Sequence, residues 1–239
     1  MKKSLFLALS VFASTALYAV DVDFGFGLGA FYSDTFYSSS ADGNATKYDG
    51  TSVARDIVTL AENNIGAYLF LDATYVELDF ALAGATLNNK YSPQVASGTR
   101  LDFSLLGRYP FPLGTAAVIY PMFGIELDLL LSPKTSAGED WSPSKTRIDL
   151  SEPGKYNSGD SIEVSDLTNI WIRIGGGADI KLGGNFFLRS QLIWGIKFDN
   201  RYDLNIEKAN SGSNYKHFNH GPTFRLAVGY KIPFAREKK

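Results

Sequence analysis

Residues 76–84 read VELDFALAG, a stretch in which apolar residues alternate with charged or small ones. Successive side chains of an extended strand point to opposite faces, so the apolar residues at even positions would share one face. Glu77 and Asp79 would share the other. Because this period of two differs from that of a helix, the stretch predicts a β-strand with one apolar and one polar face.

The same alternation recurs along most of the chain, in segments of about ten residues, the length that a tilted strand needs to cross a bilayer. In each segment one face is free of charged residues. We therefore predict eight strands, at 21–32, 63–72, 74–86, 100–111, 117–131, 169–181, 186–198 and 222–234.

The connections between these strands alternate in length. Three are short, near Ala73, at 112–116 and at 182–185, and four are long. Outer-membrane barrels have short periplasmic turns and long extracellular loops, so this alternation predicts both the class and the orientation. The long connections are 33–62, 87–99, 132–168 and 199–221.

The N-terminus has the layout of an export signal. Lys2 and Lys3 precede an apolar run from Leu5, and small residues follow up to Ala19. We expect residues 1–19 to be removed. After residue 20 no uncharged apolar stretch reaches the ~18 residues that a spanning helix needs.

Composition excludes several classes of function. The 239 residues carry a net charge of -2, which gives no basis for nucleic acid as a partner. The absence of cysteine excludes disulfides and thiolate chemistry. We expect no cofactor and no metal site.

Alternation alone does not say which face points outward, and a soluble barrel with an apolar cavity is the rival. Two features favour the membrane. Aromatic residues recur near the strand ends, as in the girdles of membrane barrels. Glycines crowd the polar face, where they suit a narrow lumen; they are Gly25, Gly27, Gly29, Gly66, Gly124, Gly175, Gly177, Gly195 and Gly229.

The fold class expected over residues 20–234 is all-β: an eight-stranded antiparallel up-and-down transmembrane β-barrel. Its last segment, FRLAVGYKIPF at 224–234, resembles the assembly strand of outer-membrane barrels, and a charged tail follows at 235–239. The chain resembles the small barrels typified by the OmpA transmembrane domain, OmpX and the OmpW family. That resemblance implies the bacterial outer membrane as location, membrane lipid as surroundings, and the barrel-assembly machinery as a partner through the strand ending at Phe234.

If the apolar face meets lipid, the charged residues line the lumen. Acidic residues come mostly from the first five strands and basic ones from the last three, so closing the barrel brings opposite charges together. We expect Glu126 and Asp128 to pair with Arg173 and Arg225. This network would form either a packed polar core or a gated ion path; it comprises Glu77, Asp79, Asp102, Arg108, Glu126, Asp128, Arg173, Arg189, Arg225 and Lys231.

Phe31, Leu130 and Trp171 also face inward by parity, near the extracellular end. An apolar mouth above a charged plug resembles the OmpW arrangement for small hydrophobic molecules. The alternative is that these side chains merely cap the polar core.

We expect no enzyme. The only histidines are His217 and His220, and no recognisable catalytic or metal-binding set surrounds them, although Ser211 and Ser213 lie in the same predicted loop. Two functions stay open: transport of small or hydrophobic solutes, or a structural role, through the barrel; and binding of extracellular ligands by the long loops.

Overall fold

The computed structural model describes residues 23–41, 57–87, 95–140, 168–197 and 215–232. In this part of the chain no helix is long and apolar enough to cross a membrane. The described elements are β1 (Phe24–Ala41), β2 (Ile57–Ala73), β3 (Val76–Leu87), β4 (Ser97–Arg108), β5 (Phe111–Leu113), β6 (Ala117–Lys134), β7 (Thr168–Gly183), β8 (Phe186–Lys197) and β9 (Tyr215–Lys231).

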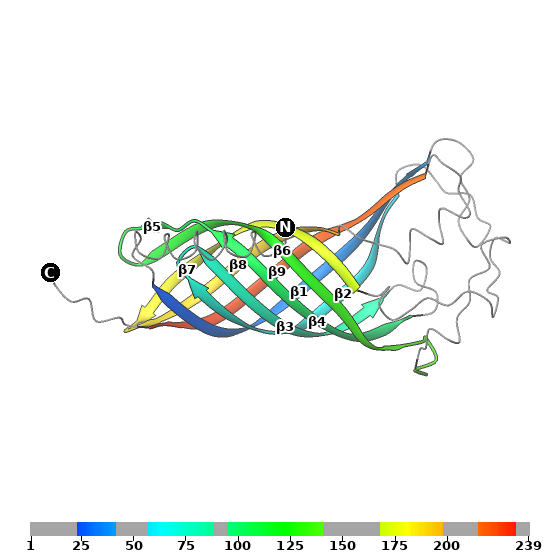
Figure 1. The fold of residues 1–239 in the computed structure, drawn as a ribbon, viewed down its shortest axis with the longest axis horizontal. Coiled ribbons are helices and arrows are strands. Elements are labelled where there is room, and N and C mark those ends of the chain that lie inside the picture. The colour runs from blue at the N-terminus through cyan, green and yellow to red at the C-terminus, as the bar shows by residue number, and fades with distance from the viewer. Residues whose placement is uncertain (1–22, 42–56, 88–94, 141–167, 198–214, 233–239) are drawn as a thin grey trace, which may run out of the picture.

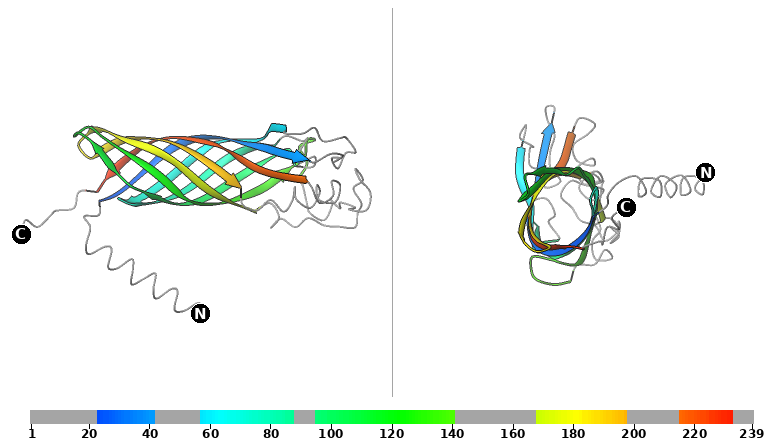
Figure 2. Two further views of the ribbon diagram at one scale, coloured as in Figure 1. Left: turned by 90° about the horizontal axis from the view of Figure 1, so that it is seen from above. Right: turned by 90° about the vertical axis from the view of Figure 1, so that its left-hand side faces the viewer.

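The strands form one closed antiparallel barrel (Figure 1). Each wall strand pairs with the next one along the chain, and β1 pairs with β9 to close the ring that Figure 2 shows end-on. The three-residue β5 pairs only with the start of β6 and stands outside the count, since β4 pairs directly with β6. The predicted eight-stranded up-and-down barrel is confirmed.

Three strands extend six residues or more beyond an end that the sequence indicated. The segments 33–62 and 199–221 were predicted as loops, and this prediction is wrong where strands extend into them. β1 continues to Ala41, β2 begins at Ile57 and β9 begins at Tyr215. The hydrophobic pattern marks only the stretch inside lipid, whereas the hydrogen-bonded ladder continues beyond it across a bulge between Thr35 and Phe36.

The outer face of the wall is apolar and exposed. Leu28 pairs with Leu69 on one side and Val228 on the other, and at least half the surface of each of these side chains is uncovered. Similar pairs of outward apolar side chains recur on the other strands around the barrel. A soluble protein does not expose an apolar band of this size, because water contact with it costs about 25 cal/mol per Å². This is therefore a transmembrane barrel, with lipid against the band.

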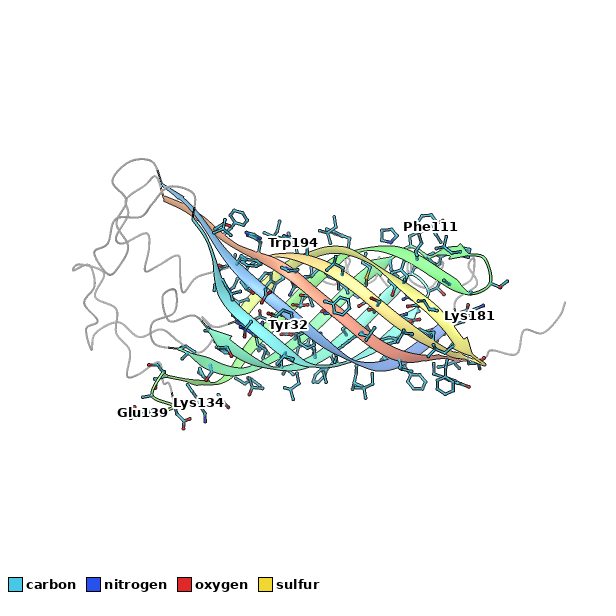
Figure 3. All side chains as sticks on the ribbon, turned by 180° about the vertical axis from the view of Figure 1, so that it is seen from behind. Tyr32, Phe111, Lys134, Glu139, Lys181 and Trp194 are labelled. Carbon is cyan, nitrogen blue, oxygen red and sulfur yellow. The ribbon has the colours of Figure 1, made fainter. Side chains whose placement is uncertain are left out.

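Aromatic side chains mark the two edges of this band. At the end with short turns, Tyr109 contacts Tyr75 and Phe111 at ring separations of 5.9 and 5.1 Å. Towards the other end lie Tyr32 and Trp194 (Figure 3). Eight residues of β9 between Tyr230 and Pro222, the partner of Trp194, cover roughly 20 Å along the barrel axis at a tilt of about 40°. That span suits the apolar band of an outer membrane.

The lumen holds large side chains because glycines on neighbouring strands leave room for them. A Cβ on Gly27 would lie 2.4 Å from the ring of Phe70, and one on Gly229 would lie 2.2 Å from the ring of Phe187. Tyr120 lies over Gly177 in the same way, 2.6 Å from the Cβ position. The glycines of the polar face thus accommodate a crowded interior, as the sequence indicated.

We predict that Gly27→Val destabilises the folded barrel by about 1–3 kcal/mol, because the added atoms overlap the Phe70 ring and the carbonyl oxygen of Val228. The matched control is Gly84→Val, whose added Cβ meets no atom within 4 Å. Urea unfolding in lipid vesicles, followed by the heat-dependent gel shift, measures both. Equal stability of the two variants would contradict the packing argument.

Candidate functional site

The candidate site is the interior of the barrel, where inward side chains form three layers of ion pairs. We call them the turn-end, middle and outer layers, counted from the end with short turns. The turn-end layer consists of Asp72, Glu77, Arg108, Asp179, Arg189 and Lys231, from β2, β3, β4, β7, β8 and β9 respectively.

Arg189 is the centre of the turn-end layer and is fully buried. Its guanidinium donates to both oxygens of Asp179 at 2.8 and 2.7 Å. It also donates to Glu77 at 2.7 Å and to Asp72 at 2.6 Å. One side chain of β8 thereby joins carboxylates of three other strands across the lumen. Hydrogen bonds between charged groups are about twice as strong as neutral ones.

A second guanidinium and an ammonium complete this layer. Arg108 lies 3.1 Å from Asp72 and 3.3 Å from Glu77, and Lys231 donates to Asp72 at 2.8 Å. Tyr120 of β6 donates its hydroxyl to Asp179 at 3.0 Å. With Tyr120 included, every wall strand except β1 contributes a side chain to the layer.

Aromatic rings hold the central cation from the sides. The guanidinium carbon of Arg189 lies 4.1 Å from the ring centroid of Phe70 and 5.0 Å from that of Phe187. The ring faces carry partial negative charge and attract a cation within about 6 Å. Phe70 and Phe187 occupy the spaces left by Gly27 and Gly229, so the glycines also position the cation–π contacts.

The middle layer centres on Glu126 of β6. Its carboxylate bonds Arg173 of β7, lies 3.3 Å from Arg225 of β9, and accepts the hydroxyl of Ser104 at 2.9 Å. Arg225 also bonds Asp79 of β3. The structure thus brings Glu126 against both arginines that the sequence paired with it.

The outer layer centres on Arg100 of β4. Arg100 donates to both oxygens of Glu62 at 2.6 and 2.5 Å and also bonds Asp128. Asp128 further accepts from Asn169 at 2.8 Å and from the indole of Trp171 at 2.7 Å. The expected pairing of Asp128 with Arg173 or Arg225 is therefore wrong. Asp128 belongs to a layer nearer the extracellular end.

Sequence reasoning missed Arg100 and Glu62 for different reasons. Arg100 shares the parity of Asp102 and Arg108, so the alternation of β4 could have identified it. Glu62 fell in a segment predicted as loop, and only the extension of β2 makes it a lumen residue.

Asp102 is the exception among the lumen carboxylates. It is buried and lies directly opposite Asp128 in the β4–β6 register. Within the described ranges it makes no ion pair, and its Oδ1 has no hydrogen-bond partner. The described lumen holds eight buried carboxylates against five buried arginines and the partly exposed Lys231. The carboxylates outnumber the cations by two, and Asp102 is the one among them that makes no ion pair within the described residues.

The predicted apolar mouth is dispersed in the structure. Phe31 packs with Tyr68 and Phe70, and Leu130 packs with Ala85 and Val95. Trp171 is buried against Arg173 and bonded to Asp128. All three side chains face inward, but they do not share one apolar surface.

His220 lies on the outer face of β9, away from the lumen. Its Nε2 is 2.7 Å from the hydroxyl oxygen of Ser38, and its ring stacks on Trp194 with the centroids 5.5 Å apart. Ser211 and Ser213 lie outside the described residues, as do the signal segment and Phe234. Among the residues that the structure describes, no three His, Asp or Glu side chains are placed to hold a metal ion.

We predict opposite effects on stability for substitutions of Asp102 and Asp128, two carboxylates that lie side by side on neighbouring strands in the lumen. Asp102→Asn removes a buried carboxyl that has no ion-pair partner among the described residues and should raise stability by about 1 kcal/mol or more. Asp128→Asn removes a partner of Arg100 and should lower stability by about 3 kcal/mol. Urea midpoints of both variants in vesicles provide the measurement. A lower midpoint for Asp102→Asn would mean that its charge is compensated in the folded barrel.

No family model matches this chain, and no curated protein matches it. Solved structures that resemble it include Ail, the attachment invasion locus protein of Yersinia pestis, with 10% identity over 89% of this chain and 100% of that chain at a TM-score of 0.39. Neisserial surface protein A has 11% identity over 87% of this chain and 97% of that chain, at a TM-score of 0.44. The N-terminal β-barrel domain of Pseudomonas aeruginosa OprF has 13% identity over 86% of this chain and 99% of that chain, at a TM-score of 0.35. These neighbours are small outer-membrane β-barrels, the class that the sequence resembled.

Proposed function

We propose that this protein is a bacterial outer-membrane barrel that is closed to solutes and serves as a membrane scaffold for its extracellular end. Three features support this proposal. The apolar band fits a bilayer, the lumen is filled by paired side chains, and three strands extend past the band on the side of the long connections.

The observation that carries the proposal is the turn-end layer. Its side chains come from seven of the eight wall strands and contact one another across the lumen. Arg189 is fully buried, with carboxylates and rings around it. A passing ion would have to separate these pairs, and removing one partner of a buried ion pair costs about 3–5 kcal/mol. Such a layer acts as a plug.

The extracellular end is the remaining place for a specific activity. Beyond the bulge at Thr35, β1 stays paired with β2 and β9, and the outward side chains there include the exposed Val58, Leu60 and Phe218. Exposed apolar side chains at the border of the band are typical of interaction surfaces. This observation favours surface binding over transport of hydrophobic molecules, for which Phe31, Leu130 and Trp171 would have to share one surface.

The test is conductance of the refolded protein in planar bilayers, after the heat-dependent gel shift has shown that it is folded. We expect the wild type and a Lys134→Ala control to show no discrete openings, since Lys134 is exposed at the opposite end from the turn-end layer (Figure 3). In Arg189→Ala we expect discrete openings to appear, because the substitution removes the one guanidinium that joins Asp72, Glu77 and Asp179 and leaves only Arg108 and Lys231 beside them.

Wild-type openings whose size or frequency changes in Glu126→Ala would overturn the proposal. In that case the middle layer would be part of a gated ion path, and the barrel itself would transport.

A further inference from the structure

Asp102 of β4 is the one buried carboxyl of the described lumen that the three ion-pair layers do not use. Only 8% of its surface is exposed, and its Oδ1 has no hydrogen-bond partner among the described residues. On one side its register partner is Ala81 of β3, which offers no polar group, and on the other it is Asp128 of β6. Two carboxyl groups are therefore adjacent inside a barrel that has little room for water.

The charged groups that act on Asp102 come from three strands, and they are Arg100 of β4, Glu126 and Asp128 of β6, and Arg173 of β7. The two arginines are already engaged, because each bonds a carboxylate of its own layer. An ionised Asp102 would therefore face two acidic neighbours without a cation of its own. A buried carboxyl in such a place is neutralised by a proton, since burying an unpaired charge is more costly.

The hydrogen bonds decide which of the adjacent carboxyls takes the proton. Asp128 accepts from Arg100, Asn169 and the indole of Trp171, so donors already occupy its oxygens. The carboxylate of Glu126 likewise accepts from arginine and from Ser104. Asp102, with Oδ1 unbonded and no ion pair in the described lumen, is left as the proton-binding group.

We propose that Asp102 binds a proton in the folded barrel at neutral pH and remains a neutral carboxylic acid. The proton allows Asp102 to lie beside Asp128 and Glu126 without charge repulsion, at the point where the outer and middle layers adjoin. Loss of this proton at higher pH would place three negative charges on neighbouring positions of β4 and β6 and would weaken both layers. The site goes beyond the scaffold role and does not depend on it, because the turn-end layer that closes the lumen does not include Asp102.

Infrared difference spectroscopy of the refolded protein at neutral pH detects the proton directly. The C=O stretch of a protonated carboxyl is distinct from the bands of carboxylates and amides, and an ester-free detergent keeps lipid carbonyls out of the spectrum. Wild type minus Asp102→Asn should contain this band. The matched control is Asp179→Asn, the same substitution at a buried carboxylate that is paired with Arg189, and its difference spectrum should lack the band.

The pH dependence of stability is the second measurement. Above pH about 5 an aspartate of the unfolded chain has lost its proton, so the folded barrel would bind one proton more than the unfolded chain. Each pH unit should then lower the folding equilibrium constant of the wild type about tenfold relative to that of Asp102→Asn. Urea unfolding in vesicles between pH about 5 and 7 measures this ratio, in which the contributions of the two histidines cancel. The ratio of wild type to Asp179→Asn should stay constant.

Absence of the carboxylic-acid band from wild type minus Asp102→Asn would overturn the proposal. So would a wild-type to Asp102→Asn ratio that does not change with pH, because it would mean that Asp102 is ionised in the folded barrel. The heat-dependent gel shift confirms that each variant is folded. Neither result bears on the conductance test above, so the two proposals fail separately.

Discussion

The narrow lumen is the constraint on which the rest of the structure depends. Inside an eight-stranded barrel there is space for side chains but little for water, so inward polar groups are satisfied mainly by other side chains. Arg189 shows the result, since it satisfies carboxylates of three strands at once. The same limit on space explains the glycines, because Phe70 and Phe187 fit only where the neighbouring strand has no Cβ.

The lipid imposes the complementary constraint on the other face. Because strand side chains alternate strictly, a residue that faces lipid fixes the direction of both its neighbours. Leu28 exposed to lipid therefore places Gly27 and Gly29 in the lumen, against Phe70 and Tyr68. The two faces of each strand therefore depend on each other. A shift of register by one residue would put charged side chains into lipid and leucine side chains into the lumen.

Together these constraints divide the barrel into residues that form the packed lumen and residues that lie outside it. The turn-end, middle and outer layers are built on the same strands, and Asp102 is the one buried carboxylate of the described lumen that makes no ion pair. The exposed Val58, Leu60 and Phe218 lie on the outward face of the extended β2 and β9, outside the three ion-pair layers. Activity that requires binding of a partner is therefore more compatible with the extracellular end of the barrel than with its interior.

The sequence by itself determined the number of strands, their two faces and the gathering of acids and bases in one lumen, because a period of two is a local property of the chain. It also indicated that Glu126 meets Arg173 and Arg225. Only the tertiary structure decided that Asp128 meets Arg100 and that Glu62 is a lumen residue. Which charges share a layer depends on the stagger between strands and on where each ladder ends, and those are set by closure of the β1–β9 seam.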